Sequence, residues 1–142
     1  MKQIVTTKEE KYIELRFFEW TKVVVVEETD MLLKLNLLGA ESPVVFNVEI
    51  LDNTKADLKM YLCTENPFPD EKKCMREVDR LKVFKFAARK KARYFEMEDF
   101  CYITMKSQLG CTLKIAVSSD KLRALFVPEK AKEFNKAMTK SE

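Results

Sequence analysis

Apolar and polar residues alternate with a period of two along much of the chain, which predicts β-strands with one side facing a core. Within residues 44–50, every second position is a large apolar residue, and Asn47 and Glu49 lie between them. The predicted strands cover residues 11–27 with a break near Trp20, 31–38, 44–50, 58–62, 81–88, 93–97, 100–105 and 111–117. About eight short strands with frequent turn signals are typical of an all-β, antiparallel β-sandwich, here jelly-roll-like.

The turns between these strands predict how they pair. The expected neighbours are residues 44–50 with 58–62, 81–88 with 93–97, and 100–105 with 111–117. Residues 64–79 contain Pro67 and Pro69, which argue against a central strand, so we expect this stretch to cross from one sheet to the other. The uninterrupted run from Val23 to Val26 is typical of a strand covered on both faces.

The C-terminal residues 127–142 follow a different pattern. Pro128 suits the first turn of a helix, and an apolar stripe at helical spacing is formed by Val127, Ala131, Phe134 and Met138. A helix of about ten residues is marginal alone in water, so its stripe must dock on the sandwich or on another molecule. We therefore expect a β-sandwich domain over residues 1–126 and a C-terminal α-helix or tail over 127–142.

The composition excludes several classes of enzyme. The 142 residues contain no histidine, which removes Ser-His-Asp and Cys-His catalysis and mixed Cys/His zinc sites. The two glycines, Gly39 and Gly110, cannot form a Gly-rich phosphate loop. We expect neither catalytic residues nor a cofactor. Carboxylate or lysine chemistry is the enzymatic alternative that these absences leave open.

The charge balance gives no sign of a nucleic-acid partner. Lys and Arg number 26 against 23 Asp and Glu, a net charge of +3. A basic group from Lys85 to Arg93 is followed by Glu96, Glu98 and Asp99, so we expect a solvated hairpin tip there. The polar start, Met1–Glu10, lacks an apolar signal region, and no stretch is apolar enough for a membrane span. We expect the protein to stay inside the cell.

Four cysteines are present, Cys63, Cys74, Cys101 and Cys111. None belongs to a Cys-x₂₋₄-Cys knuckle, which argues against a zinc site. An intracellular setting favours free thiols that act as small core hydrophobes. A disulfide between Cys101 and Cys111 or between Cys63 and Cys74 is the alternative for an oxidising compartment.

Two stretches carry a family resemblance. Residues 56–61 (Ala-Asp-Leu-Lys-Met-Tyr) lead into the Asn-Pro-Phe-Pro segment of residues 66–69, and residues 100–105 and 110–117 form a closing pair. Over roughly residues 20–118 the chain resembles the pre-peptidase C-terminal domain, although Asp99 stands where that family usually has a glycine. The resemblance implies a small β-sandwich that binds other macromolecules and is not catalytic. Some members of the family hold calcium.

Calcium binding is therefore one alternative function. Asp52, Asn53 and Asp57 could supply oxygen ligands to calcium at the edge of the sandwich. The same residue types also stabilise tight turns, which explains Asp52 and Asn53 equally well.

The first predicted strand is apolar on both sides. Tyr12, Phe18 and Trp20 lie on one side, opposite Ile13, Leu15 and Phe17. Tyr12, Phe18 and Trp20 are candidate partner-binding residues. Either the terminal helix or a bulge covers these rings, or a partner protein does.

We hypothesise a non-enzymatic protein-interaction or structural module that contacts other proteins through Tyr12, Phe18, Trp20, Phe134 and Met138. It would be a subunit of a larger intracellular assembly, for example a cytoskeletal or axonemal one, and would then be cytoplasmic and associated with the cytoskeleton or cilium. The alternative is a calcium- or ligand-binding β-sandwich.

Overall fold

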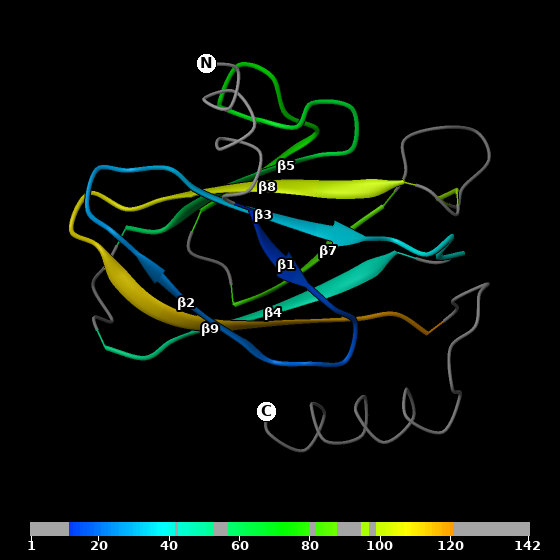
Figure 1. Cartoon of the computed structure of the whole chain (residues 1–142), viewed down its shortest axis with the longest axis horizontal. Helices are drawn as coiled ribbons and strands as arrows, with labels where there is room; N and C mark the ends of the chain where they lie inside the picture. Colours follow the sequence, from blue (N-terminus) through cyan, green and yellow to red (C-terminus); the bar gives the residue numbers. More distant parts are fainter. Residues whose placement is uncertain are drawn as a thin grey trace, which may run out of the picture.

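The computed structural model describes residues 12–41, 43–52, 57–79, 82–87, 95–96 and 99–120. Two sheets pack face to face as an all-β sandwich (Figure 1). The strands are β1 (Ile13–Leu15), β2 (Thr21–Val25), β3 (Met31–Asn36), β4 (Val44–Ile50), β5 (Lys59–Cys63), β6 (Arg76–Asp79), β7 (Val83–Phe86), β8 (Phe100–Lys106) and β9 (Cys111–Ser118). The fold class predicted for the sandwich is confirmed. The predicted helix over 127–142 lies outside the described residues.

The five-stranded sheet has the order β1-β3-β8-β5-β6, and the four-stranded sheet has the order β2-β9-β4-β7. All pairs are antiparallel except β1 with β3. The core lies between the two sheets, where the alternating apolar residues meet. Its largest fully buried side chains include Phe46, Phe86, Leu33, Ile103 and Leu113. Burying each such side chain contributes roughly 1.5–3 kcal/mol, so this layer is the main source of stability.

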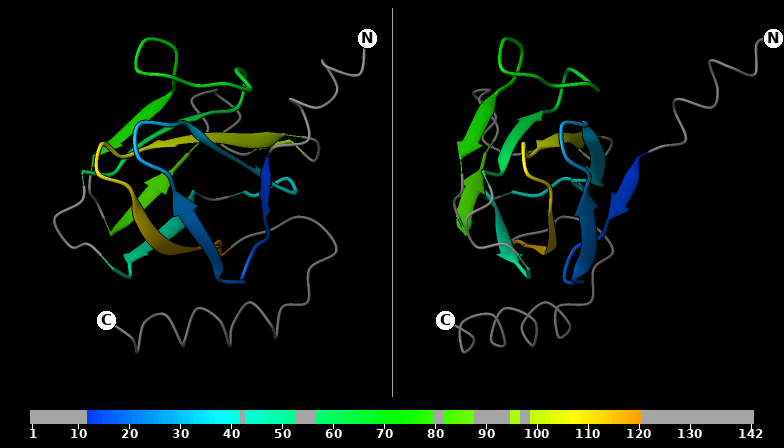
Figure 2. Two further views of the ribbon diagram at one scale, coloured as in Figure 1. Left: turned by 60° about the vertical axis from the view of Figure 1, so that its left-hand side comes forward. Right: turned by 90° about the vertical axis from the view of Figure 1, so that its left-hand side faces the viewer.

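The first predicted strand is interrupted, as expected, and its two halves belong to different sheets. β1 pairs with β3, whereas β2 pairs with β9. In Figure 2 the chain runs from β1 around a turn into β2. Phe18 has a positive φ of 62° and donates its backbone N–H to the Val117 carbonyl at 2.8 Å. This turn allows the consecutive rings of Phe17 and Phe18 both to enter the core, which a regular strand could not do.

The predicted strand pairing is wrong for two of the three pairs. β4 pairs with β7 and β9, whereas β5 pairs with β6 and β8. β8 and β9 likewise belong to different sheets. The physical reason is that a short connection can span the roughly 10 Å between packed sheets as easily as it can form a hairpin. Alternation shows which side of a strand is buried and does not show which sheet the strand joins.

The third predicted pair involves residues 93–97, most of which lie outside the described residues. Phe95, which is described, is not in a strand, and its ring stacks on that of Phe86 at 5.8 Å between centroids. β7 instead pairs with β4.

Two further expectations are corrected. Residues 64–75 do not cross between the sheets, because they return the chain to β6, beside β5 in the same sheet. β6 was missed because Val78 is its single apolar residue, as suits an edge strand. The run Val23–Val26 is covered on one face only: Val23 and Val25 are buried, whereas Val24 and Val26 are about half exposed.

Candidate functional site: the two outer faces of the sandwich

Each sheet has an outer face that points away from the core. We call the outer side of the five-stranded sheet the covered face, defined by Tyr61, Cys63, Thr104 and Tyr102. We call the outer side of the four-stranded sheet the open face, defined by Trp20, Val24, Val26, Leu51 and Val83. The two names refer to the exposure of these side chains only. Ala116 and Ser118 of β9 also point outward from the four-stranded sheet and are buried, so the open face is open toward β2 and at the end of β4 rather than over its whole area.

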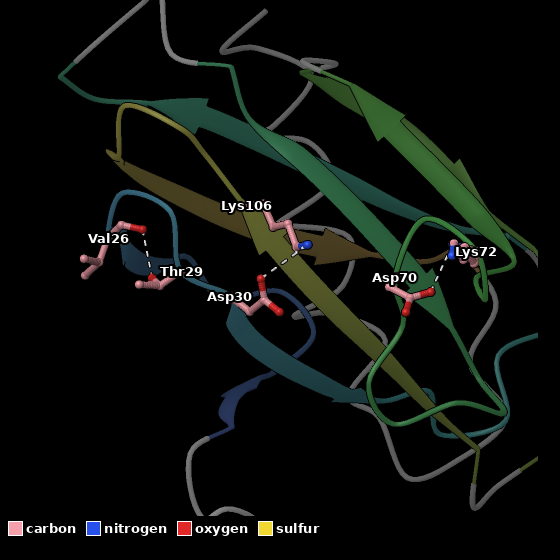
Figure 3. A network of polar contacts seen from close by, with 6 residues as sticks. All are labelled: Val26, Thr29, Asp30, Asp70, Lys72 and Lys106. Carbon is pink, nitrogen blue, oxygen red and sulfur yellow. Dashed lines mark hydrogen bonds and ion pairs between the residues drawn. The ribbon is translucent and has the colours of Figure 1, made fainter.

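Residues of the covered face are buried although they point outward. Tyr61 lies across from Thr104 in the register of β5 and β8, and both belong to the row opposite the core-facing residues. Tyr61 is 3% exposed and Thr104 is 2% exposed. The loop of residues 64–75 passes in front of the strands at Asp70 and Lys72 (Figure 3), and its residues Glu71 and Cys74 lie close enough to Tyr61 to act on the pKa of its phenol. The protein thus shields this face with its own chain.

Side-chain hydrogen bonds hold the 64–75 loop in shape. The Asp70 carboxylate accepts the backbone N–H groups of Lys72 and Lys73 at 3.0 and 2.8 Å. Asn66 accepts the N–H of Phe68 at 3.0 Å and donates to the Lys73 carbonyl at 3.1 Å. Asx turns of this kind fix a loop locally, and each hydrogen bond contributes about 0.5–1.5 kcal/mol.

Tyr12, a predicted partner-binding residue, attaches the loop to the sheet. Its hydroxyl donates to the Pro67 carbonyl at 2.6 Å, and its ring lies 6.0 Å from that of Phe68. The ring also lies 5.9 Å from that of Tyr102, and the Lys34 ammonium sits 5.4 Å from its centroid. Tyr12 therefore contacts the covered face on several sides and is only partly exposed.

Two polar groups beneath the loop have unusual surroundings. Burial and then the nearby Glu77 carboxylate raise the pKa of the Tyr61 phenol, which stays protonated at neutral pH. Within the described residues, Thr104 Oγ1 is buried and has no hydrogen-bond partner. Such a group costs about 1–3 kcal/mol, so it weakens this part of the sheet.

The open face gathers most of the exposed large apolar side chains. Of the seven in the described part of the chain, five lie on it: Trp20, Val24, Val26, Leu51 and Val83. Val24 and Leu51 both adjoin Thr112 on β9, Val24 through the β2 register and Leu51 through its N–H, which donates to the Thr112 carbonyl at 2.7 Å. Val83 lies apart from them, on the opposite edge strand β7. Exposed apolar side chains on one side of a sheet can mark an interaction surface.

A polar line crosses the open face beside these residues. The Lys114 ammonium lies 4.6 Å from the ring centroid of Trp20 and 3.3 Å from Glu49 Oε1. Lys22 lies across from Lys114 in the register of β2 and β9. Trp20, the single tryptophan of the chain, is therefore held over Lys114 while remaining 40% exposed.

The other predicted partner-binding residues do not lie with Trp20. The ring of Phe18 is 4% exposed and belongs to the core, because the turn after β1 points it inward. It is therefore not part of the exposed surface. Phe134 and Met138 lie outside the described residues. Sequence reasoning also missed Val24 and Leu51, although the outward Lys22 two residues earlier indicated that the even positions of β2 face solvent.

The carboxylates considered as calcium ligands make turn contacts, the alternative that the sequence also allows. Asp52 accepts the Thr112 N–H at 2.9 Å, and Asp57 accepts the Gln108 N–H at 3.0 Å and the Ser107 hydroxyl at 3.4 Å. Burial would raise the pKa of Asp57, but the hydrogen bonds outweigh it and hold this pKa below its usual value. Both carboxylates thus join turns, while Asn53 lies outside the described residues. Among the described side chains, no group of three or more His, Cys, Asp or Glu is arranged to hold a metal ion.

The cysteines are free thiols, and three of the four are buried. Burial, with a smaller contribution from Cys63, raises the pKa of the Cys101 thiol well above its usual value. Burial and the Asp52 carboxylate raise that of Cys111. Both remain protonated at neutral pH, and a protonated thiol is a poor nucleophile.

Comparison with known proteins gives similarity of fold. No protein-family model and no curated protein matches the sequence. The pre-peptidase C-terminal domain of collagenase from Bacillus anthracis is similar over 77% of this chain and 96% of that domain, with 9% identity and a TM-score of 0.49. The Yersinia pseudotuberculosis-derived mitogen is similar over 79% of this chain and 91% of its own, with 9% identity and a TM-score of 0.52.

The second likeness shows a shared β-sandwich fold and nothing further. The resemblance to the pre-peptidase C-terminal domain that the sequence predicts is confirmed as a distant one.

A helix of the length and apolarity needed to span a membrane is not found in the described part of the chain.

Proposed function

We propose that this chain is a non-enzymatic protein-interaction module that binds a partner protein through its open face. The observation that carries the proposal is that five of the seven exposed large apolar side chains in the described part of the chain lie on the outer side of one sheet, while the 64–75 loop passes over the opposite sheet (Figure 3). Interface cores are enriched in aromatic residues, and here Trp20 provides the aromatic group.

The chemistry of the chain supports a role without catalysis. No histidine is present, and the buried thiols of Cys101 and Cys111 are held in the protonated form. Asp52 and Asp57, the carboxylates first considered as calcium ligands, are engaged by backbone N–H groups. We propose that the chain is a subunit of a larger intracellular assembly, for example a cytoskeletal or axonemal one.

We further propose that residues 127–142 form a helix and extend the binding surface. Phe134 and Met138 would then contact the partner together with Trp20. The apolar stripe on this segment supports the idea, because a short amphipathic helix needs a surface on which to dock. Tyr12 is proposed to act indirectly, by fixing the 64–75 loop.

An affinity capture from native cell extract tests the proposal. The bait variants are Val24→Lys and Leu51→Lys, which place a charge on the open face. Leu109→Lys is the matched control, because Leu109 is also exposed and apolar but lies in the turn between β8 and β9. We expect the two open-face variants to recover the captured proteins at least about tenfold less well, which corresponds to about 1.4 kcal/mol.

Equal recovery by all three variants would contradict the proposal. A further bait that lacks residues 127–142 tests the role of the C-terminal segment separately. Loss of the same proteins supports docking through that segment, and full recovery contradicts it.

A further inference from the structure

The free edge of the four-stranded sheet suggests a particular partner. β2 forms one end of that sheet, and among the described strands β9 is its single neighbour (Figure 2). The backbone N–H and C=O groups that point away from β9 are therefore in a position to pair with a further strand.

β2 is also the least protected of the four edge strands. Edge strands avoid unwanted pairing by being short or by carrying charge. β6 has three charged residues among its four, and β1 has only three residues in all. β7 carries Lys85 in its four residues. β2 has five residues, of which three are valine and one, Lys22, is charged.

We propose that β2 pairs with β2 of a second copy of this chain, antiparallel and about a two-fold axis through Val23. In this register Val23 meets Val23 of the second copy, Lys22 meets Val24, and Thr21 meets Val25. All five residues of the strand are then paired. The arrangement is isologous, so it closes at two copies and does not propagate into a fibre.

Charge and side-chain direction select this register over its neighbours. A shift of one residue would place core-facing positions opposite solvent-facing ones. A shift of two residues one way would place Lys22 directly opposite Lys22 of the second copy, and like charges in that position are destabilising. A shift of two residues the other way would move Thr21 opposite Glu27, outside the strand.

The same register covers exposed apolar groups of the open face. Trp20 and Val26, one residue beyond each end of β2, come to lie across from each other on its outward side. They are 40% and 52% exposed, and aromatic with β-branched pairs are favourable across strands. Val24, which is 53% exposed, packs on the aliphatic part of the Lys22 side chain of the second copy. Two-fold symmetry makes each of these contacts twice.

This inference rests on the proposed function, since it names one partner for the edge of the open face. The dimer and the proposed function can nevertheless be rejected independently of each other. A five-residue strand pair buries little area, so we expect a weak dimer with a dissociation constant between about 1 μM and 1 mM.

Sedimentation equilibrium of the full chain tests the inference with two opposite substitutions of one residue. In the proposed register Val24→Glu places a carboxylate opposite Lys22 of the second copy, and Val24→Lys places an ammonium there. Because each contact occurs twice, we expect Val24→Glu to tighten the dimer about fivefold and Val24→Lys to weaken it about fivefold. Leu109→Glu and Leu109→Lys change the net charge equally at an exposed site away from the edge and should leave the dissociation constant unchanged.

Circular dichroism and the melting temperature establish that all four variants fold. A chain that stays monomeric up to about 1 mM overturns the inference. The inference is also overturned if both Val24 variants shift the dissociation constant in the same direction. It is overturned as well if the Leu109 variants shift the dissociation constant as the Val24 variants do. If the chain is monomeric and Val24→Lys still reduces capture from extract, the dimer is rejected while the proposed function stands.

Discussion

The two outer faces of this sandwich follow the same alternation of inward and outward residues, yet their large apolar side chains differ in exposure. On the five-stranded sheet, outward residues such as Tyr61 and Thr104 are almost completely buried. On the four-stranded sheet, Trp20 and Val24 remain about half exposed. The difference lies in the connections. One face has a long loop, fixed by Asn66 and Asp70, that folds back over it, and no described loop covers the exposed residues of the other.

An exposed apolar residue is therefore informative only after the chain's own cover has been considered. Tyr12 and Trp20 look equivalent in the sequence, as aromatic residues on one side of a predicted strand. Tyr12 belongs with the covered face, where it donates a hydrogen bond to the Pro67 carbonyl. Trp20 belongs with the open face, where its ring keeps a solvent-exposed part.

The largest expected effect is a difference in stability between the faces. Replacing Tyr61 by Ala leaves a cavity beneath the loop and should lower the free energy of unfolding by about 3 kcal/mol. Trp20→Ala removes a half-exposed ring and should cost less than about 1 kcal/mol. Urea unfolding of both variants measures the difference. Similar losses for the two would show that the open face is as well packed as the covered face.

The second effect concerns the thiol of Cys63, which is 6% exposed. Loosening the loop with Asn66→Ala and Asp70→Ala removes three of its hydrogen bonds to the backbone N–H groups of residues 68, 72 and 73. We expect site-resolved iodoacetamide labelling of Cys63 to become about tenfold faster, because the loop opens more often. Cys101, which is fully buried, provides the internal reference.

A control for the loop variant is Asn36→Ala. Asn36 makes a similar turn contact, accepting the Leu38 N–H at 3.0 Å, but it lies at the end of β3. Labelling of Cys63 should not change in this variant. An unchanged rate in the loop variant would mean that the loop does not provide the cover.

A third effect is a pH dependence specific to the covered face. The pKa of Tyr61 is raised in the folded chain above its ordinary value of 10.0. The unfolded chain therefore loses this proton at a lower pH than the native one. The associated stability is present below pH 10.0 and is lost as the pH rises from there through the raised pKa. In the Tyr61→Phe variant, the decrease in the free energy of unfolding that comes from this phenol should disappear. Urea unfolding of both proteins across that pH range measures it.

The smallest expected effect is on the open face itself. Leu51→Lys and Val83→Lys replace half-exposed apolar side chains and should change the free energy of unfolding by less than about 0.5 kcal/mol. Thermal unfolding with Leu109→Lys as the reference checks this. A loss above about 2 kcal/mol would place these side chains in a packed layer of the domain and remove them from the proposed surface.

Much of the fold could be predicted from the sequence, because alternation is a local property. Residues 44–50 were predicted with the bounds of β4, and the break after the first strand was predicted near Trp20. Strand pairing was not predictable, because Val48 and Met60 carry the same inward pattern whether or not their strands belong to one sheet. The edge strand β6 was not predicted, because three of its four residues are charged and it shows no alternation of apolar residues.

The candidate site was predicted only in part, for a related reason. Trp20 was identified, but Phe18 was placed on the same side as Trp20 because a regular strand was assumed through residues 16–20. The positive φ of Phe18 reverses that expectation, and no glycine marks the turn in the sequence. Val24 and Val26 were hidden inside a continuous apolar run, where a one-sided edge strand cannot be distinguished from a strand buried on both sides.

Hydroxyl-radical footprinting of the tagged chain tests the central claim most directly, because among the described residues each face carries one aromatic side chain that is at least 40% exposed. Trp20 lies on the open face, and the 52% exposed Phe68 lies on the loop of the covered face. Oxidation of each residue is compared by mass spectrometry between the purified chain and the chain captured with its partners from extract. We predict that Trp20 is protected several-fold in the captured form while Phe68 is oxidised equally in both. Protection of Phe68 with unchanged oxidation of Trp20 would contradict the account.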